Sequence, residues 1–100
     1  MRLDPAATFP CGHDRPALCV SWGVGGAVAS GGGDNSVRLF CETPGGDGGV
    51  WRQIGAAESA HEDEVNGVAW HPTERGVLAS CSDDGTAKIW RVTPRARAEG

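Results

Sequence analysis

Residues 77–90, VLASCSDDGTAKIW, together with HEDEVNGVAW at 61–70, decide the fold of this 100-residue chain. Apolar and polar residues alternate over short runs, and turn-forming residues separate these runs, as β-strands require. An incomplete copy of the same pattern lies upstream, as HDRPALCVSW at 13–22 and AVASGGGDNSVRLF at 27–40. The chain therefore contains one strand-rich unit twice.

The two copies stand at a near-constant spacing. The matched pairs are His13/His61 and Trp22/Trp70 at 48 residues, and Asp34/Asp84 and Phe40/Trp90 at 50 residues. Repeats of this kind have a usual period of about 40–45 residues, and a strand–turn–strand unit that ends in tryptophan is typical of a β-propeller blade. The excess length lies largely in the insert ETPGGDGG at 42–49.

The sequence predicts an all-β fold of two antiparallel blades. The first unit has strands at 17–22, 27–31, 37–41 and 50–55, and the second at 65–70, 77–81 and 86–92. The residues after 92 contain a proline and have no strand character, so the second blade lacks its fourth strand. We expect a poorly structured segment at 1–12, blades at 13–60 and 61–92, and a tail at 93–100.

Turn signals support this division. Tight hairpin turns are predicted at Asn35-Ser36 and at Asp84-Gly85, because these residues tolerate positive φ or cap their own backbone. The glycine-rich insert 42–49 is expected to form a loop on the face opposite the Asp84 turn. Propellers commonly close by pairing the last three strands with an N-terminal strand, and the prolines in 1–12 disfavour one there. We therefore expect the closing piece of the ring to be absent from this sequence.

The composition argues against nucleic-acid binding, a membrane-spanning segment and a signal peptide. The net charge of −4 argues against a nucleic-acid groove, which needs many phosphate contacts. No apolar run is long enough to span a membrane, and the start MRLDPAATFP lacks the apolar stretch of a signal peptide. We expect a cytosolic protein, with the nucleus as a second compartment.

The four cysteines predict neither a metal site nor a cofactor. They stand at positions 11, 19, 41 and 81, without a Cys-x-x-Cys pair and without histidines at zinc-finger spacing. Cys19 and Cys81 fall inside predicted strands, where a thiol behaves as a small apolar residue. Reduced, structural cysteines are therefore expected.

Both units contain the residue types of a hydrolase triad, as His13, Ser30 and Asp34 and as His61, Ser80 and Asp84. The strand-to-helix elbow of serine hydrolases is missing, and an enzyme rarely needs one active site per repeat. A buried network explains the set better, because the indole N–H of Trp90 can also donate to it. Phe40 stands at the tryptophan position of the first unit and has no donor, so that blade should be held less tightly. The chain is predicted not to be an enzyme.

The spacing His61…Trp70…Ser80…Asp84…Trp90 resembles the WD-repeat family of β-propellers, although Trp90-Arg91 and Phe40-Cys41 replace the usual Trp-Asp. HEDEVNGVAWHP, GVLASCSDDGTAKIW and SGGGDNSVRLFCE are similar to the last two repeats of the cytosolic iron–sulfur protein assembly group of that family. The resemblance implies part of a seven-bladed scaffold without an active site. It also implies a small cluster-carrying partner, a helical-repeat adaptor and client apoproteins that receive [4Fe–4S] clusters.

A binding surface is expected on the face that carries the Asp34 and Asp84 turns, since loops on a rigid sheet are common recognition sites. The candidate partner-binding residues are Asp63, Glu64, Asn66 and Asp83. Other interpretations stay open: a different WD-repeat scaffold such as a ubiquitin-ligase substrate receptor, a hydrolase using His61 or His13, or a truncated, inactive fragment.

Overall fold

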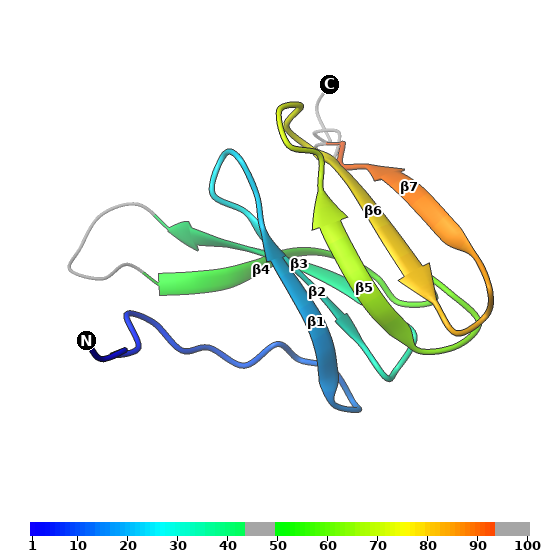
Figure 1. The fold of residues 1–100 in the computed structure, drawn as a ribbon, viewed down its shortest axis with the longest axis horizontal. Helices are drawn as coiled ribbons and strands as arrows, with labels where there is room; N and C mark the ends of the chain where they lie inside the picture. Colours follow the sequence, from blue (N-terminus) through cyan, green and yellow to red (C-terminus); the bar gives the residue numbers. More distant parts are fainter. Residues whose placement is uncertain (44–49, 94–100) are drawn as a thin grey trace, which may run out of the picture.

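The computed structural model describes residues 1–43 and 50–93 and has an all-β fold of two antiparallel sheets (Figure 1). In the first sheet the strands are ordered β1-β2-β3-β4, and in the second β5-β6-β7. The strands are β1 Ala17–Trp22, β2 Val28–Gly32, β3 Val37–Thr43, β4 Val50–Ala57, β5 Val65–Trp70, β6 Val77–Ser82 and β7 Ala87–Arg91. The predicted fold class, one sheet of four strands followed by one of three, is confirmed for the described residues.

Every strand end lies within two residues of its predicted position, and the differences have local causes. β7 begins one residue late, because the amide and hydroxyl of Thr86 are engaged by the Asp84 carboxylate. β3 and β4 are longer than predicted, since their antiparallel pairing continues to Thr43↔Val50 at one end and to Val37↔Ala57 at the other. Positions 44–49 of the predicted loop and 94–100 of the predicted tail lie outside the described residues.

The first hairpin turn lies one residue earlier than predicted. Asn35, with a φ of 70°, is the residue in the left-handed region, and Gly85 has the matching place in the second sheet with a φ of 87°. Ser36 instead closes the hairpin, because its carbonyl accepts the amide of Gly32. Both loops follow the three-residue hairpin pattern, in which the last loop residue takes positive φ.

The core lies between the two sheets, where β1 runs beside β5 (Figure 1). Its buried residues are Ala29, Val37, Ala60, Val65 and Leu78. A Cβ added at Gly31 would lie 2.6 Å from a methyl carbon of Val65, so the sheets approach too closely there for any side chain. The indole Nε1 of Trp70 donates to the carbonyl of Ser21 at 3.0 Å and fixes β5 on β1.

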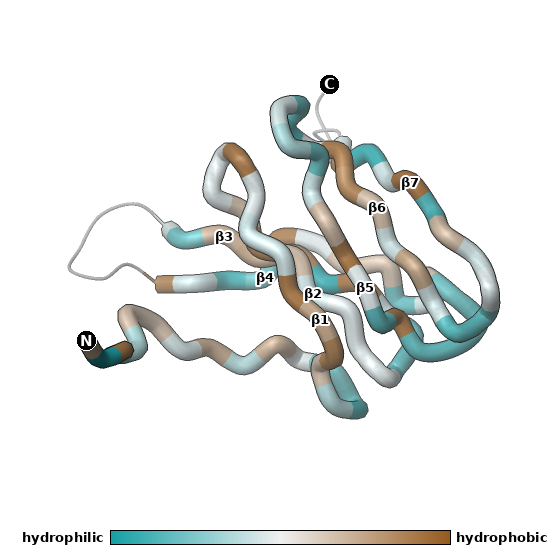
Figure 2. The backbone as a smooth tube through the Cα atoms, viewed as in Figure 1, coloured by the Kyte–Doolittle hydropathy of each residue, from teal (hydrophilic) through white to brown (hydrophobic). Residues whose placement is uncertain are grey.

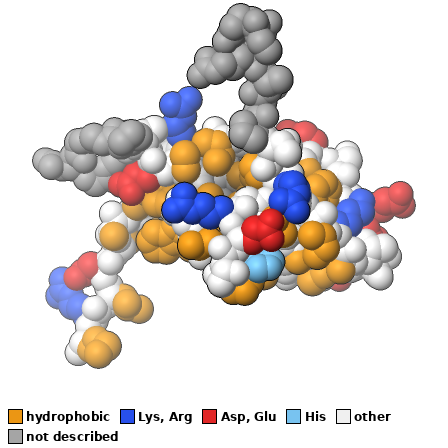
Figure 3. All heavy atoms as spheres, turned by 90° about the horizontal axis from the view of Figure 1, so that it is seen from above, with side chains coloured by type: hydrophobic (Ala, Val, Ile, Leu, Met, Phe, Trp, Pro, Cys, Tyr) orange, Lys and Arg blue, Asp and Glu red, His pale blue; other side chains and the backbone are white. Residues whose placement is uncertain are grey.

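Figure 2 colours the chain by hydropathy and shows hydrophobic and hydrophilic residues in turn along β7. Successive side chains of a strand point to opposite faces of the sheet, so this pattern gives one face apolar and the other polar character. Figure 3 shows that hydrophobic side chains also reach the surface, between lysine, arginine and carboxylate groups. The two sheets thus leave part of their apolar faces uncovered.

The N-terminal segment has neither helix nor strand over 1–12, yet it contacts the first sheet. The ring of Phe9 stacks on Trp51 with centroids 5.2 Å apart and lies tilted against Phe40 at 5.1 Å. Aromatic pairs at these separations add favourable energy beyond their buried area. Among the described residues, no helix is long and apolar enough to cross a membrane.

Candidate functional site

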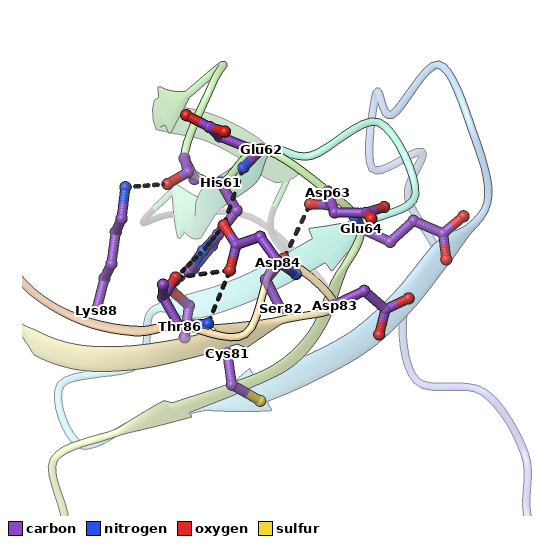
Figure 4. A network of polar contacts seen from close by, with 12 residues as sticks. His61, Glu62, Asp63, Glu64, Cys81, Ser82, Asp83, Asp84, Thr86 and Lys88 are labelled. Carbon is purple, nitrogen blue, oxygen red and sulfur yellow. Dashed lines mark hydrogen bonds and ion pairs between the residues drawn. The ribbon is translucent and has the colours of Figure 1, made fainter.

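A hydrogen-bonded network ties together four segments of the second sheet (Figure 4). His61, just before β5, contacts the Ser80 hydroxyl in β6 through Nε2 at 2.7 Å. Its Nδ1 contacts Asp84, in the turn after β6, at 3.1 Å. The indole Nε1 of Trp90 in β7 donates to the Ser80 hydroxyl at 2.8 Å. His61 and Ser80 are only 3% and 2% exposed, so the network replaces water for these two side chains.

The directions of these bonds follow from donor chemistry. A carboxylate only accepts, so Nδ1 of His61 carries the hydrogen and donates to Asp84. Nε2 is then an acceptor and takes the hydroxyl hydrogen of Ser80, whose oxygen accepts from Trp90. The result is one continuous chain of donors from indole to carboxylate, in which each bond polarises the next.

The Asp84 carboxylate has further donors. The Thr86 hydroxyl donates to it at 2.6 Å, and the backbone amides of Glu62 and Thr86 donate at 3.0 and 2.9 Å. The Thr86 hydroxyl, the Glu62 amide and then the remaining donors, including His61, hold the pKa of Asp84 well below its usual range against a smaller opposing effect of burial. Asp84 is therefore ionised and anchors the turn to the residues that precede β5.

The first sheet repeats this arrangement with one element missing. His13 reaches Asp34 at 2.9 Å, Ser30 at 2.8 Å and Ser36 at 2.9 Å, and the amide of Asp14 donates to Asp34. Burial acts to raise the pKa of Asp34, but the hydrogen bonds from Ser36, Asp14 and His13 outweigh it and lower that pKa well below its usual value.

The missing element in the first sheet is an indole donor. Phe40 is 3% exposed and stands where Trp90 stands in the second sheet, so the hydroxyl of Ser30 receives no bond from that position. The guanidinium of Arg38 partly compensates at the outer end of the network, where it contacts Glu58 at 3.0 Å and Asp34 at 3.9 Å.

The structure thus brings together the predicted residues of each set. Phe40 lies beside the first network but is not hydrogen-bonded to it. Sequence reasoning missed Ser36 and Thr86, which stand two residues after the turn aspartates and donate hydroxyl hydrogens to them. An Asp-x-Ser/Thr pattern in a tight turn is a signal for such local capping.

The serine hydroxyls of these networks are buried, which limits the reactions that they could carry out on a substrate. The order Ser–His–Asp matches that of a hydrolase triad, but Ser80 is 2% exposed and Ser30 is 1% exposed. The hydroxyl of Ser80 also accepts the indole N–H, which opposes its use as a nucleophile. A nucleophile must be reachable by substrate and lie next to oxyanion donors. The geometry therefore favours a structural role.

All four cysteines lie in the part of the chain that the structure describes, and each has a free thiol. Within 1–43 and 50–93, no cluster of three or more histidine, cysteine or acidic side chains could hold a metal ion. The Sγ of Cys19 lies between the carbonyls of Gly31 and Val65, at 3.7 and 3.6 Å, and burial raises its pKa. Cys81 is exposed, with its Sγ 3.7 Å from the side-chain oxygen of Asn66.

The four candidate partner-binding residues surround the second turn. Asp63, Asn66 and Asp83 are exposed and Glu64 is half-buried. Figure 4 shows Asp63, Glu64 and Asp83 on one side of the His61–Asp84 contact. The Asn66 amide donates to Asp83, and the Asp83 backbone amide donates to the Glu64 carbonyl at 3.1 Å. We call these four residues the acidic rim.

Comparisons with known proteins give one family and close relatives. The sequence matches the family described as "WD domain, G-beta repeat" over residues 4–41 and 54–91. It is 40% identical over 85 residues to a probable cytosolic iron-sulfur protein assembly protein CIAO1 homolog of Nematostella vectensis. It is 43% identical over 83 residues to a probable cytosolic iron-sulfur protein assembly protein Ciao1 of Drosophila mojavensis. These alignments cover 82% and 80% of the chain but only 26% and 25% of the relatives, so the chain spans about a quarter of their length.

Proposed function

Because this chain belongs to the WD-repeat family, we propose that it is a non-catalytic scaffold in cytosolic iron–sulfur protein assembly. The observation that supports this most directly is the similarity to two assembly proteins across both repeats. The structure adds a physical reason. Both nitrogens of each network histidine are engaged within the sheet, so the polar groups that resemble catalysts are occupied in holding strands together.

The proposed partners are those of an assembly platform: a small cluster-carrying subunit, a helical-repeat adaptor and client apoproteins. The [4Fe–4S] cluster is cargo of that machinery, and we assign no cofactor to this chain. We propose the cytosol as its compartment, with the nucleus as a second. We also propose that residues 13–60 and 61–92 are the two blade units and that 1–12 and 93–100 flank them.

The acidic rim is the proposed contact surface of this scaffold. Three of its four side chains are exposed, and the backbone beneath them is fixed by the bond from Asp83 to Glu64 and by the Ser82 hydroxyl, which donates to the Asp63 carbonyl at 3.1 Å. A rigid, negatively charged edge of this kind suits a partner with basic side chains. Its charge contributes mainly to association rate and specificity, and salt weakens it.

The proposed contact surface can be tested by co-purification of the tagged chain with the iron–sulfur assembly subunits. The double variant Asp83→Lys with Asn66→Ala removes the rim contact and reverses one charge, and we expect several-fold weaker capture. Glu74→Lys is the matched control, because it reverses a charge on the β5–β6 hairpin, at the other end of the sheet. Equal capture by the double variant and wild type, at equal thermal stability, would exclude the rim as the contact surface.

The same purified chain can be used to distinguish the proposed function from a different WD-repeat scaffold and from a hydrolase. If the wild-type chain captures ubiquitin-ligase subunits and none of the assembly subunits, it is a WD-repeat scaffold of a different pathway. Labelling of Ser30 or Ser80 by a serine-reactive probe would support the hydrolase interpretation. We expect no labelling, since both hydroxyls are buried and hydrogen-bonded.

A further inference from the structure

The β5–β6 hairpin is held by a histidine side chain. His71 follows β5 directly, and its backbone amide donates to the Val77 carbonyl at 2.7 Å, which closes the base of the hairpin. The imidazole Nδ1 of His71 accepts the backbone amides of Thr73 at 3.1 Å and of Glu74 at 2.9 Å. Gly76 completes the loop with a φ of 78°. One ring nitrogen therefore takes two backbone amides in the middle of this loop.

The matching hairpin of the first sheet is closed without a side chain. Gly23 stands 48 residues before His71, and its amide donates to the Ala27 carbonyl at 2.9 Å, as the His71 amide does to Val77. Three residues lie between Gly23 and Ala27, and five lie between His71 and Val77. The shorter loop is closed by the Gly26 amide, which donates to the Gly23 carbonyl at 3.1 Å. The longer loop uses an imidazole where the shorter one uses a backbone carbonyl.

The two bonds to Nδ1 define the protonation state of the His71 ring. A backbone amide only donates, so Nδ1 accepts both bonds through its lone pair and carries no hydrogen. The hydrogen of the neutral ring is then on Nε2. The charged imidazolium has a hydrogen on both nitrogens and no lone pair left, so it cannot accept either amide. The closed loop therefore requires a neutral His71.

His71 differs in this respect from the other two histidines of the chain. In His13 and His61 the Nδ1 atom contacts an aspartate, which is compatible with a hydrogen on that nitrogen. Only at His71 do two donors meet at Nδ1. The residue is exposed, so a proton reaches the ring without unfolding of the sheet. Histidine is the side chain whose charge ordinarily changes between about pH 5 and 8.

The charged groups around this hairpin belong to the hairpin itself and to β7. The Glu74 carboxylate lies 3.1 Å from the guanidinium of Arg91, and both side chains are exposed. Arg75 extends over the β1–β2 hairpin, where a Cβ added at Gly25 would lie 3.4 Å from its Nε. Residues 23–27 of that hairpin carry no charge. Figure 1 shows the two hairpins at the same edge of the sheets, so the loop after His71 contacts both β7 and the neighbouring sheet.

We propose that His71 is a pH-sensitive cap of the β5–β6 hairpin: the neutral ring holds the loop closed, and protonation of the ring releases it. The released loop binds one more proton than the closed loop, so acidification favours release. The ratio of released to closed loop rises by up to about tenfold for each pH unit. Release frees Glu74 and Arg75 from their fixed positions beside β7 and the β1–β2 hairpin.

The experiment follows the full chain, labelled with nitrogen-15, by NMR from about pH 8 to about pH 5. The two nitrogens of an N–H···N hydrogen bond share a scalar coupling, which reports the bond directly. We expect couplings from the His71 Nδ1 to the amide nitrogens of Thr73 and Glu74 at the higher pH, and their loss at the lower pH. The protection of these two amides from hydrogen exchange should fall by about tenfold or more as the ring is protonated.

Two variants separate capping from protonation. In His71→Asn the side-chain oxygen can accept amides of the following turn, as in Asx-turns, but it does not titrate. We expect the Thr73 and Glu74 amides to stay protected at both pH values in His71→Asn, and to lack protection at both in His71→Ala.

The proposal is overturned by any of three results. These are a hydrogen on Nδ1 of His71 at the higher pH, a ring that stays neutral at the lower pH, and a loss of amide protection in His71→Asn that matches wild type. None of these results bears on the proposed scaffold function, because the acidic rim lies at the other end of β5 and β6.

Discussion

Ser80 and Ser30 give a matched pair of perturbations, because they occupy the same place in the two networks. Ser80→Ala removes the hydroxyl that accepts from Trp90 at 2.8 Å and donates to His61 at 2.7 Å. Ser30→Ala removes a hydroxyl with one network partner, His13 at 2.8 Å. Both serines are almost fully buried, at 2% and 1% exposure, so water cannot replace the lost groups in either sheet.

The difference between the two variants follows from the number of partners left unsatisfied. An unpaired buried donor or acceptor costs about 1–3 kcal/mol. Ser30→Ala leaves one such group and should cost about 1–3 kcal/mol, whereas Ser80→Ala leaves two and should cost about 2–4 kcal/mol, since Trp90 is only half-buried. Loss of the indole acceptor therefore accounts for a difference of about 1 kcal/mol. In a domain of this size that corresponds to about 4–8 °C in melting temperature.

The assay is thermal and urea unfolding followed by circular dichroism and tryptophan fluorescence. Trp90→Phe is the third variant, because it gives the second sheet the residue of the first at that position. In the Trp90→Phe background the Ser80→Ala cost should fall by about 1 kcal/mol, which is the coupling energy of the indole–hydroxyl pair. Equal costs for Ser80→Ala and Ser30→Ala, together with no coupling to Trp90, would refute the assignment of the indole to this network.

Three further predictions use the same unfolding assay or simple thiol chemistry. Asp34 has a folded-state pKa below its unfolded value of about 3.9, so its contribution is present above that pH and is lost as pH falls. The urea midpoint should therefore drop on acidification from neutral pH to pH 3, and it should drop less steeply in Asp34→Asn. Phe40→Trp offers the first network an indole donor worth about 1 kcal/mol, but the site is 3% exposed and packed against Phe9, where overpacking costs about 1–3 kcal/mol. We expect a net loss of stability, and a raised melting temperature would contradict it. Cys81 should react with iodoacetamide faster than Cys19, whose thiol pKa is raised by burial, and mass spectrometry of timed digests would reveal the opposite order.

The fold was predictable because each strand carries its own signal. Alternation over Val65–Trp70 and turn residues at Asp84-Gly85 define the second sheet without reference to the first. The constant spacing then extends the assignment to the weaker copy. The turn at Asn35 was misplaced by one residue, because Asn and Ser both favour turns and only the chain geometry shows which one takes positive φ.

Long-range packing was not predictable from such local signals. Nothing in the residues around Phe9 indicates that its ring stacks on Trp51, more than forty residues further along the chain. Local sequence likewise gives no sign that Trp70 lies at the sheet–sheet contact while Trp22 lies on an exposed face. The two residues have the same sequence pattern, and only the presence of a neighbouring sheet separates their environments.

The hydrogen-bonded network of the second sheet and the acidic rim are joined through the turn that contains Asp83 and Asp84. His61 binds the turn carboxylate of Asp84, and the same turn presents Asp83 to solvent while its backbone is held by Glu64. Because bonds on both sides fix this turn, the backbone that carries the rim residues loses little entropy in the proposed partner contact. In the proposed scaffold, the buried histidine thereby contributes to recognition without touching a partner. A network whose histidine and serine are buried can in this way serve a protein whose proposed work is done at its surface.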